Sequence, residues 1–588
     1  MTRDSKMHPV RIDHNVPITL RDGTKTYANV FRPDVKGAFP ALLHRTPYDK
    51  FAGDNYLGPI NPHIGAMNGY VSVIQDVRGR YSSEGDFTPF FFEQQDGYDS
   101  VEWVAGQPWC DGNVGMTGIS YAGATQWLAA KAKPPSLKAI APGYTASDYH
   151  EGWTWQGGAF ELGFNLSWAT GALTAYHWGK LSERLKTTEQ QRDELYAAKD
   201  DLNSGYAYTP LSDLPFLKNG LAPYYYEWMK HPEYDEYWKS ICIDESHNEI
   251  EIPAFNYGGW HDVFLGGTIS NYKRMKLLGK SQSARHGQRL LIGPWVHQRN
   301  APALSGDVWY GTRAAAIVDG LPDRLLHFFD YWLKGVNNGL MSERSVRVFT
   351  MGENRWHDYE EWPPPRAEET VYYLRGSGNA NTAHGDGTLS QDAPGAEPPD
   401  QYVYDPLDPV PTMGGQLCCD PAFMRWGAYD QRSVEERSDV LVYSTPPLKD
   451  DLEVTGPVSV TLYAGSSALD TDFTAKLVDV EVSGYARNLT DGIIRARYRQ
   501  SRSTARFIKP GQVFEYTIDL WATSNLFRKG HRLRLEISSS NFPRFNRNSN
   551  TGGSILDERV STYQSASQTV YHDDVYPSHL TLCVVPTG

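Results

Sequence analysis

A short apolar strand runs directly into a glycine-containing turn and then a helix between residues 114 and 132. The sequence predicts the strand at Val114–Thr117 and the helix at Ala122–Ala132, joined by Gly118-Ile-Ser-Tyr-Ala-Gly123. A tight turn of this kind exposes its central serine, Ser120, and places a backbone N–H, that of Tyr121, at a helix N-terminus where an oxyanion is stabilised. The turn therefore predicts a βα sheet with Ser120 as candidate nucleophile. The alternative is a serine that only caps the helix.

Further strand-like runs surround this turn. They are Ala38–His44, Tyr70–Gln75, Leu137–Ala141, Pro253–Tyr257 and Arg289–Gly293. Strands that alternate with helical stretches are typical of a parallel sheet with helices on its faces. We therefore predict an α/β fold.

The 588 residues suffice for about three or four domains. We expect residues 1–148 and 246–360 to form the two halves of the α/β domain. Residues 149–245 are rich in Trp, Tyr and Leu at helical spacing, with a long helix-forming segment at Leu181–Ala198, and predict an inserted helical cap. Residues 361–588 are predicted to be a linker and an all-β domain.

The expected linker comprises Glu361–Arg366 and Gly376–Pro399, which are rich in Pro, Gly and Ala. After about residue 436 apolar and polar residues alternate, as in strands separated by turns. The clearest such runs are Pro457–Tyr463, Phe473–Val482, Phe514–Asp519 and Arg532–Ser538. Regular short strands of this kind predict a sandwich or jelly roll.

Composition excludes several classes of function. A net charge of −14 with no long basic run disfavours nucleic acid and anionic membranes as partners. We see no signal peptide and no apolar run of about 18 residues, so a soluble cytoplasmic protein is expected. Five cysteines without a CxxC pair fit a reducing compartment, and we interpret Cys418 and Cys419 as two buried thiols rather than a vicinal disulfide.

A serine nucleophile needs a base and an orienting carboxylate, which α/β-hydrolases place after later strands in the order Ser, acid, His. Asp262 follows the strand at Pro253–Tyr257, and His297 follows the strand at Arg289–Gly293. Taken singly, each residue is more often a loop or surface residue. The order and the positions after strands favour a Ser120–His297–Asp262 triad, with His261 as a rival base.

Other candidate motifs lack residues that their function requires, so no cofactor and no metal site is predicted. Gly279-Lys-Ser281 lacks the first glycine of a phosphate-binding loop, and Gly376-Ser-Gly378 lacks the third glycine of a dinucleotide fingerprint. No Cys/His cluster has zinc spacing. Asp470-Thr-Asp472 is a candidate for calcium, but we interpret it as a structural turn.

Several longer motifs resemble the X-prolyl dipeptidyl-peptidase family, in the branch that holds bacterial cocaine esterase and the α-amino acid ester hydrolases. The family elbow is G-x-S-Y-x-G, which residues 118–123 match. The other matching segments are Asp76–Gly85, Asp96–Asp99, Trp109–Met116, Gly258–Asp262, Gly293–His297, Arg437–Tyr443 and Asp470–Phe473. The resemblance therefore covers most of the chain.

The resemblance implies an α/β-hydrolase domain, a helical cap and a C-terminal jelly roll. It implies Ser120 as nucleophile, His297 as base and Asp262 as its partner. It also implies a tyrosine hydroxyl as second oxyanion donor beside the Tyr121 N–H, and in this sequence that tyrosine is Tyr48. The absence of an HGGG run after the Ala38–His44 strand agrees, because another donor is then needed. A packed surface aromatic is the alternative for Tyr48.

Substrate choice follows less directly. Amine-recognising members need carboxylates near the site, and in the amino-ester hydrolases acidic residues directly follow the triad aspartate. Here the apolar Val263-Phe264-Leu265 follow, although Asp148 and Glu151 are available to supply a charge. Trp153, Trp155 and Phe264 are the candidate substrate-binding residues, with Phe160 and Trp168 as further cap aromatics.

We expect a serine hydrolase that cleaves small carboxylic esters or amides through an acyl-enzyme. The alternatives are an α-amino acid ester hydrolase or X-Pro dipeptidyl-peptidase, and an inactive scaffold that binds carbohydrate. The sequence leaves homo-oligomerisation open.

Overall fold

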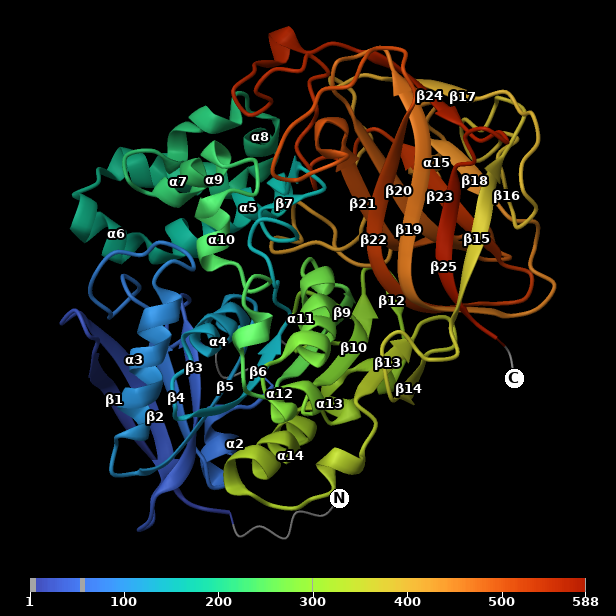
Figure 1. Cartoon of the computed structure of the whole chain (residues 1–588). Helices are drawn as coiled ribbons and strands as arrows, with labels where there is room; N and C mark the ends of the chain where they lie inside the picture. Colours follow the sequence, from blue (N-terminus) through green and yellow to red (C-terminus); the bar gives the residue numbers. More distant parts are fainter. Residues whose placement is uncertain (1–6, 53–58, 299, 587–588) are drawn as a thin grey trace.

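The computed structural model describes residues 7–52, 59–298 and 300–586. Figure 1 shows three parts: an α/β part at the bottom, a helical cap at the upper left and a β-rich part at the upper right. The chain builds the first half of the α/β part, then the cap, then the second half and finally the β-rich part.

A ten-stranded sheet forms the centre of the α/β part. Its order is β1-β2-β4-β3-β5-β6-β9-β10-β13-β14, and pairing is parallel from β4 through β13. The strands are β1 (Val10–Thr19), β2 (Lys25–Pro33), β3 (Phe39–Thr46), β4 (Val71–Asp76), β5 (Cys110–Ile119), β6 (Leu137–Gly143), β9 (Phe255–His261), β10 (Arg289–Val296), β13 (Val346–Thr350) and β14 (Arg355–Tyr359). All the strands expected in this part are present, and β5 and β9 extend further than expected. The predicted α/β-hydrolase fold is confirmed.

Helices cover both faces of this sheet. They are α2 (Pro62–Met67), α3 (Glu93–Ala105), α4 (Tyr121–Ala132), α11 (Leu265–Leu278), α12 (Gln282–His286), α13 (Ala316–Asp319) and α14 (Leu321–Lys334). Successive strand residues point to opposite faces. Leu43 accordingly packs in the apolar cluster of α3 and α4, whereas Leu42 packs in the cluster of α14. The alternation therefore buries both faces of the sheet against helices.

The cap holds short helices and a two-stranded ribbon, β7 (Trp155–Gln156) and β8 (Ala159–Phe160). Its helices are α5 (Leu162–Trp168), a π-helix (Ala169–Thr174), α6 (Trp178–Leu185), α7 (Glu189–Asp200), α8 (Leu202–Ala207), α9 (Pro223–Lys230) and α10 (Glu236–Ile241). The expectation of a long helical segment at Leu181–Ala198 is wrong in that the segment is not continuous. Lys186 has a φ of 51° and ends α6, and Thr188 starts α7 with a capping box, so the segment forms two helices.

The C-terminal part is the all-β jelly roll. Its strands are β15 (Glu368–Arg375), β16 (Thr388–Ser390), β17 (Asp400–Tyr404), β18 (Leu441–Ser444), β19 (Leu452–Ser466), β20 (Asp472–Val480), β21 (Ala486–Arg495), β22 (Phe514–Phe527), β23 (Arg532–Ser538), β24 (Ala566–Tyr571) and β25 (His579–Val585). The four expected strands match β19, β20, β22 and β23. The expected linker at Gly376–Pro399 is wrong in part, because β16 lies within it and pairs with β15 and β18.

Two sequence interpretations in this part have different outcomes. Asp470 and Asp472 are paired with Arg497 and Arg495 at 2.8 and 2.9 Å, as expected of structural carboxylates. Cys418 and Cys419, in contrast, form a disulfide rather than two thiols, and Cys419 is exposed rather than buried. The interpretation failed because spacing reveals nothing about how a local turn orients two adjacent side chains.

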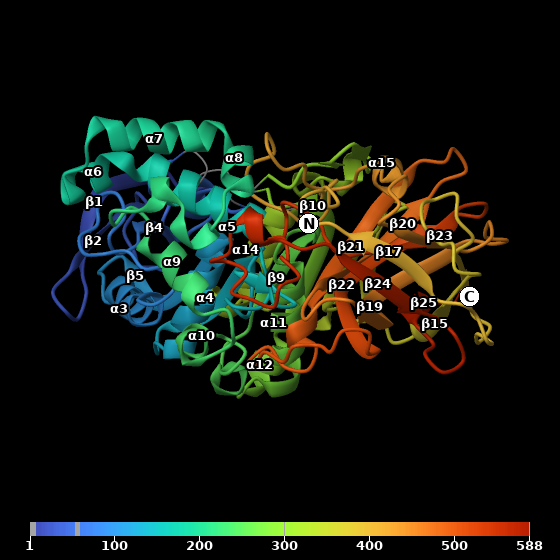
Figure 2. The same ribbon diagram turned by 90° about the horizontal axis from the view of Figure 1, so that it is seen from above.

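The view from above shows that β9, β10 and α11 lie between the cap and the jelly roll (Figure 2). One jelly-roll loop reaches the α/β sheet, since Leu417 bridges to Asp262 just after β9. Gln416 on this loop donates to the backbone oxygen of Trp260 at 3.3 Å. The jelly roll and the α/β sheet therefore meet at the carboxyl end of β9.

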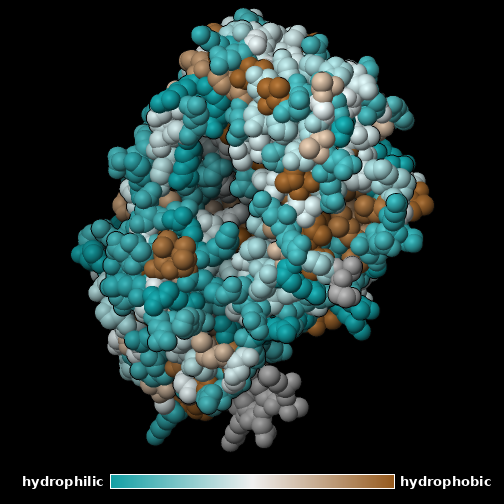
Figure 3. Space-filling model, turned by 45° about the vertical axis from the view of Figure 1, so that its right-hand side comes forward, coloured by the Kyte–Doolittle hydropathy of each residue, from teal (hydrophilic) through white to brown (hydrophobic). Residues whose placement is uncertain are grey.

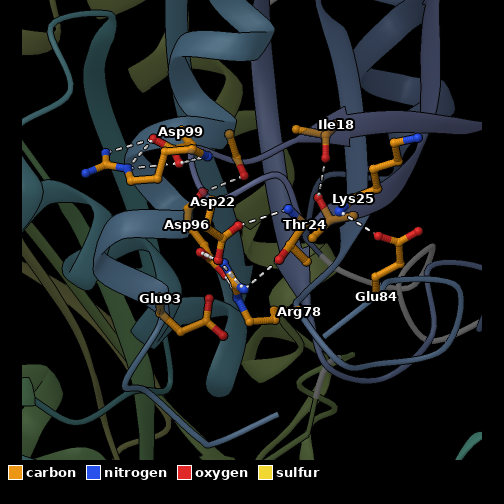
Figure 4. A network of polar contacts seen from close by, with 12 residues as sticks. Ile18, Asp22, Thr24, Lys25, Arg78, Glu84, Glu93, Asp96 and Asp99 are labelled. Carbon is orange, nitrogen blue, oxygen red and sulfur yellow. Dashed lines mark hydrogen bonds and ion pairs between the residues drawn. The ribbon is translucent and has the colours of Figure 1, made fainter. Parts of the chain in front are cut away.

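The motif at residues 76–85 is held by buried charges. The Lys50 ammonium contacts Asp76 at 2.8 Å and Ser82 at 2.6 Å, and both Lys50 and Asp76 are fully buried. Burial raises the pKa of the Asp76 carboxyl, and Lys50 opposes this effect. Arg78 makes a bidentate contact with Asp96 at 2.7–2.8 Å and a third bond to Asp22, as Figure 4 shows. These contacts fix the loops that follow β3 and β4.

No helix among the described residues is long and apolar enough to cross a membrane. On the face shown in Figure 3 most side chains are hydrophilic, and a hollow opens in its upper left part.

Removing the Lys50 ammonium is expected to destabilise the protein strongly. Lys50→Met leaves the Asp76 carboxylate buried without its partner, which typically costs about 3–5 kcal/mol. Urea unfolding followed by tryptophan fluorescence measures the change. Lys133→Met is the matched control, because its ion pair with Glu249 lies on the surface. Equal stability of the two variants would contradict a structural role for the Lys50–Asp76 pair.

Candidate active site

Ser120 lies in a strained turn between β5 and α4. Its backbone has φ 61° and ψ −126°, a conformation that residues other than glycine rarely adopt. Its side chain makes no capping hydrogen bond to α4, so the structure does not support the helix-cap alternative. The serine is instead held at the sheet edge by its backbone, whose N–H donates to Gly143 at 2.9 Å.

Two glycines of the turn explain its sequence pattern. A Cβ on Gly118 would lie 2.7 Å from the Ala122 side chain, and Gly118 also has a φ of 139°. A Cβ on Gly123 would lie 2.8 Å from the carbonyl oxygen of Gly143. The small residues thus let α4 approach β5 and β6 closely, which is how a nucleophile elbow is built.

Asp262 and His297 meet because their strands are neighbours in register. Parallel β9 and β10 pair His261 with Val296, so the residues that follow these two lie side by side. The Asp262 Oδ1 accepts from His297 Nδ1 at 2.6 Å. The Asp262 side chain is fully buried, and that of His297 is 8% exposed. With Nδ1 bonded to Asp262, Nε2 is the nitrogen through which the imidazole would act as the expected base.

The rival base, His261, faces the other way. It is buried near Tyr310, with 3.4 Å between Nε2 and the hydroxyl, and burial lowers the pKa of His261 to about 3. A histidine on the jelly-roll side of β9 cannot share the Asp262 carboxylate with His297.

The two expected oxyanion donors come from separate segments. Tyr121 is the first residue of α4, so its N–H has no partner within the helix. Its side chain is anchored, since the hydroxyl donates to Glu93 at 2.9 Å and Glu93 pairs with Arg45 at 2.7 Å. The Tyr48 hydroxyl oxygen accepts a bond of 2.9 Å from the indole N–H of Trp168, and a phenol also has an O–H to donate.

Arg80 positions the loop that carries Tyr48. This guanidinium is 1% exposed and donates to three backbone oxygens. One is that of Pro47, and the others are those of Ala172 and Leu173 in the π-helix of the cap, at 2.7–3.1 Å. The loop that carries Tyr48 and the cap are therefore joined through one buried side chain.

Aromatic rings connect His297 to the cap. Phe264 lies edge-on to the His297 ring at 5.2 Å and stacks on Trp153 at 4.0 Å between centroids. Trp153 in turn contacts Trp168 at 5.5 Å. Phe264 thus lies beside His297 and Trp153 packs against Phe264, and the substrate-binding role expected of both stays a prediction. The ring contacts of Trp155 are instead with His150 and Phe160.

The two acidic residues at the start of the cap lie elsewhere. Asp148 forms an ion pair with Arg502 of the jelly roll and accepts the backbone N–H of His150. Glu151 accepts the N–H of Gly157 at 3.0 Å, and burial raises the pKa of Glu151 to about 7. Glu151 lines a cavity of about 190 Å³ whose other lining residues include Arg502 but none of the triad residues.

Sequence reasoning missed two neighbours of His297. The Tyr144 ring lies edge-on to the imidazole at 5.9 Å, and burial and the Asp262 charge raise the pKa of its hydroxyl. Tyr144 follows the end of β6, so the rule that located Asp262 and His297 could have found it. The Cys418–Cys419 disulfide also lies beside His297, with sulfur and imidazole donor atoms within 4.8 Å of one another. No local motif points to that pair.

A cavity of about 840 Å³ lies away from these residues. It is lined by side chains of α13, α14, β10 and β13, among them Asp319 of α13, Arg289 and Arg347. None of the predicted site residues lines it.

A serine at a strained βα elbow, with a His–Asp pair after later strands of the same parallel sheet, defines the class of α/β-hydrolases. Comparisons with known proteins narrow this class. The profile of the X-Pro dipeptidyl-peptidase (S15 family) matches residues 22–299. That of the X-Pro dipeptidyl-peptidase C-terminal non-catalytic domain matches residues 338–581.

Cocaine esterase from Rhodococcus sp. is 39% identical over 583 residues, which cover 97% of this chain and 98% of the relative. Among solved structures, an aminopeptidase from the marine sediment archaeon Thaumarchaeota archaeon superposes with a TM-score of 0.79 at 26% identity, covering 100% of this chain and 98% of the other. An α-amino acid ester hydrolase gives 0.78 at 25% identity, with 99% and 98% covered. The chain belongs to the X-Pro dipeptidyl-peptidase (S15) family and is a serine hydrolase.

Removal of the Tyr48 hydroxyl should impair catalysis and leave the fold intact. Tyr48→Phe keeps the ring and deletes one oxyanion donor, which typically lowers kcat by about 10²–10³. KM should change little, because the ground-state carbonyl uses the donor weakly. Steady-state kinetics with a chromogenic ester and the melting temperature are measured together, and Tyr331→Phe on α14 is the control. A kcat of Tyr48→Phe equal to that of the control would exclude Tyr48 as donor.

Proposed function

We propose that this chain is a carboxylesterase that cleaves small esters with an aromatic acyl group through Ser120, His297 and Asp262. The supporting observation is the in-register His297–Asp262 pair at the edge of the sheet that exposes Ser120. The aromatic path from Phe264 to Trp153 and Trp168 supports the acyl preference.

In the proposed reaction Nε2 of His297 takes the proton of Ser120 as Oγ attacks the ester carbonyl. Asp262 holds the Nδ1–H and stabilises the imidazolium. The oxyanion accepts from the Tyr121 N–H and the Tyr48 hydroxyl. His297 then protonates the leaving alcohol, and water releases the acyl group by the same steps.

Ester substrates without an α-amino group are favoured over amino-ester or X-Pro substrates. An ammonium needs a nearby carboxylate that is not already neutralised. The residues after Asp262 are apolar, Asp148 is paired with Arg502, and Glu151 lines a separate cavity. Cocaine esterase among the relatives agrees with this preference, and the aminopeptidase and the α-amino acid ester hydrolase represent the alternative. The cytoplasmic location expected from the sequence stays a prediction.

The nucleophile is tested by covalent labelling. A phosphonylating reagent should modify Ser120, as located by peptide mass spectrometry, and abolish ester hydrolysis. Ser120→Ala should lower kcat by on the order of 10⁶, as removal of a triad serine does. Ser167→Ala in the cap is the matched control. Labelling of another serine, or substantial activity in Ser120→Ala, would refute the assignment.

Substrate class is tested with a matched pair of esters. The p-nitrophenyl esters of phenylacetic acid and of phenylglycine differ only by the α-amino group. We expect the higher kcat/KM for phenylacetate, because the ammonium would be desolvated among aromatic rings. A preference for phenylglycine, or release of X-Pro dipeptides from a peptide anilide, would replace the proposal by the amine-recognising alternative.

A further inference from the structure

The loop that carries the Cys418–Cys419 disulfide is fixed on both sides of the pair. Before it, Leu417 bridges to Asp262, and Gln416 donates to the Thr490 hydroxyl at 2.9 Å. After it, Asp420 pairs with Lys199 of α7 in the cap at 2.5 Å. The position of the two cysteines is therefore set by contacts with the α/β domain, the jelly roll and the cap.

The pair lies between the apolar cluster beneath the cap and solvent. Cys418 is 1% exposed and belongs to the cluster that contains Trp153 and Phe264, whereas Cys419 is exposed. The remaining cysteines of the chain, Cys110, Cys242 and Cys583, are free thiols elsewhere. A reductant or a metal ion in solution can thus reach the disulfide from the Cys419 side.

One donor atom each from Cys418, Cys419 and His297 lies within 4.8 Å of the others. Zinc binds thiolate sulfur at about 2.3 Å and imidazole nitrogen at about 2.0–2.1 Å, so its tetrahedral ligands lie roughly 3.5–4 Å apart. The donor-atom separations, at most 4.8 Å, are close to this spacing, so side-chain rotation would have to bring the set onto one ion. The ion would bind Nε2 of His297, because Nδ1 is bonded to Asp262. A carboxylate on the other nitrogen is the usual support of a zinc-bound histidine.

We propose that reduction of the Cys418–Cys419 disulfide creates an inhibitory site for Zn²⁺ and similar thiophilic cations, formed by the two cysteine sulfurs and His297. Metals bind the thiolate, so the oxidised pair offers no comparable ligands. With a phosphine as reductant, the S–S bond breaks, the phosphine becomes its oxide with oxygen from water, and two thiols form. Zinc binding then releases the two thiol protons.

Occupation of this site stops hydrolysis for a simple reason. Nε2 of His297 must accept the proton of Ser120 in the proposed reaction, and a metal ion on that nitrogen removes the base. The activity readout of this inference therefore rests on the proposed function, but metal binding itself does not.

The experiment compares oxidised and phosphine-reduced enzyme. Thiol titration should show two additional thiols after reduction. The Zn²⁺ concentration that halves ester hydrolysis should then be lower for reduced than for oxidised enzyme, by on the order of a hundredfold. Titration with Cd²⁺ should give a thiolate charge-transfer absorption of one equivalent in reduced enzyme alone. Cys418→Ser/Cys419→Ser should lose the band and the added zinc sensitivity, whereas Cys583→Ser should keep both.

Several outcomes would overturn the inference. They are a disulfide that resists reduction in the folded enzyme, equal zinc sensitivity of both redox forms, and a cadmium band that survives in the double serine variant. If that variant fails to fold, the comparison of oxidised and reduced wild-type enzyme with Cd²⁺ still tests whether reduction creates the metal site. Absence of ester hydrolysis with a cadmium band present would refute the proposed function and leave the metal site standing.

Discussion

The register of parallel strands β9 and β10 is the constraint on which the site depends. It places the residue after His261 beside the residue after Val296, and the Asp262–His297 hydrogen bond follows from that pairing. A register shift of one residue would turn the side chains to opposite faces of the sheet. Tight packing of Gly259, where a Cβ would lie 2.1 Å from the Trp295 carbonyl oxygen, leaves little room for such a shift.

The surroundings of the proposed triad come from all three parts of the chain. Phe264 belongs to the α/β domain, Trp153 and Trp168 to the cap, and Leu417 with Cys418 to the jelly roll. A domain whose profile is described as non-catalytic therefore still shapes the space beside His297. Substitutions at Leu417 or Cys418 would therefore change the surroundings of His297 without altering any of the three proposed catalytic residues.

The sequence predicted the local features and missed those that depend on distant contacts. The elbow at Ser120 and the strand-end positions of Asp262 and His297 are local patterns, and the structure places them as expected. The break between α6 and α7 was missed because helix propensity continues through Lys186, where a left-handed residue ends the helix. Trp155 lies close to Trp153 in the sequence but packs against His150. Cys418 lies near His297 only because its loop pairs with Asp262. Neither contact leaves a signal in nearby residues.

The Arg80 contacts have a consequence for how the cap can diverge. Because Arg80 binds main-chain oxygens of Ala172 and Leu173, their side chains can change without loss of either bond. The length of the π-helix from Ala169 to Thr174 is more constrained than its sequence. An insertion or deletion would move those oxygens away from the buried Arg80 guanidinium, which would then lack acceptors. Exchange of caps between related enzymes should therefore succeed or fail on the length of this segment rather than on its composition.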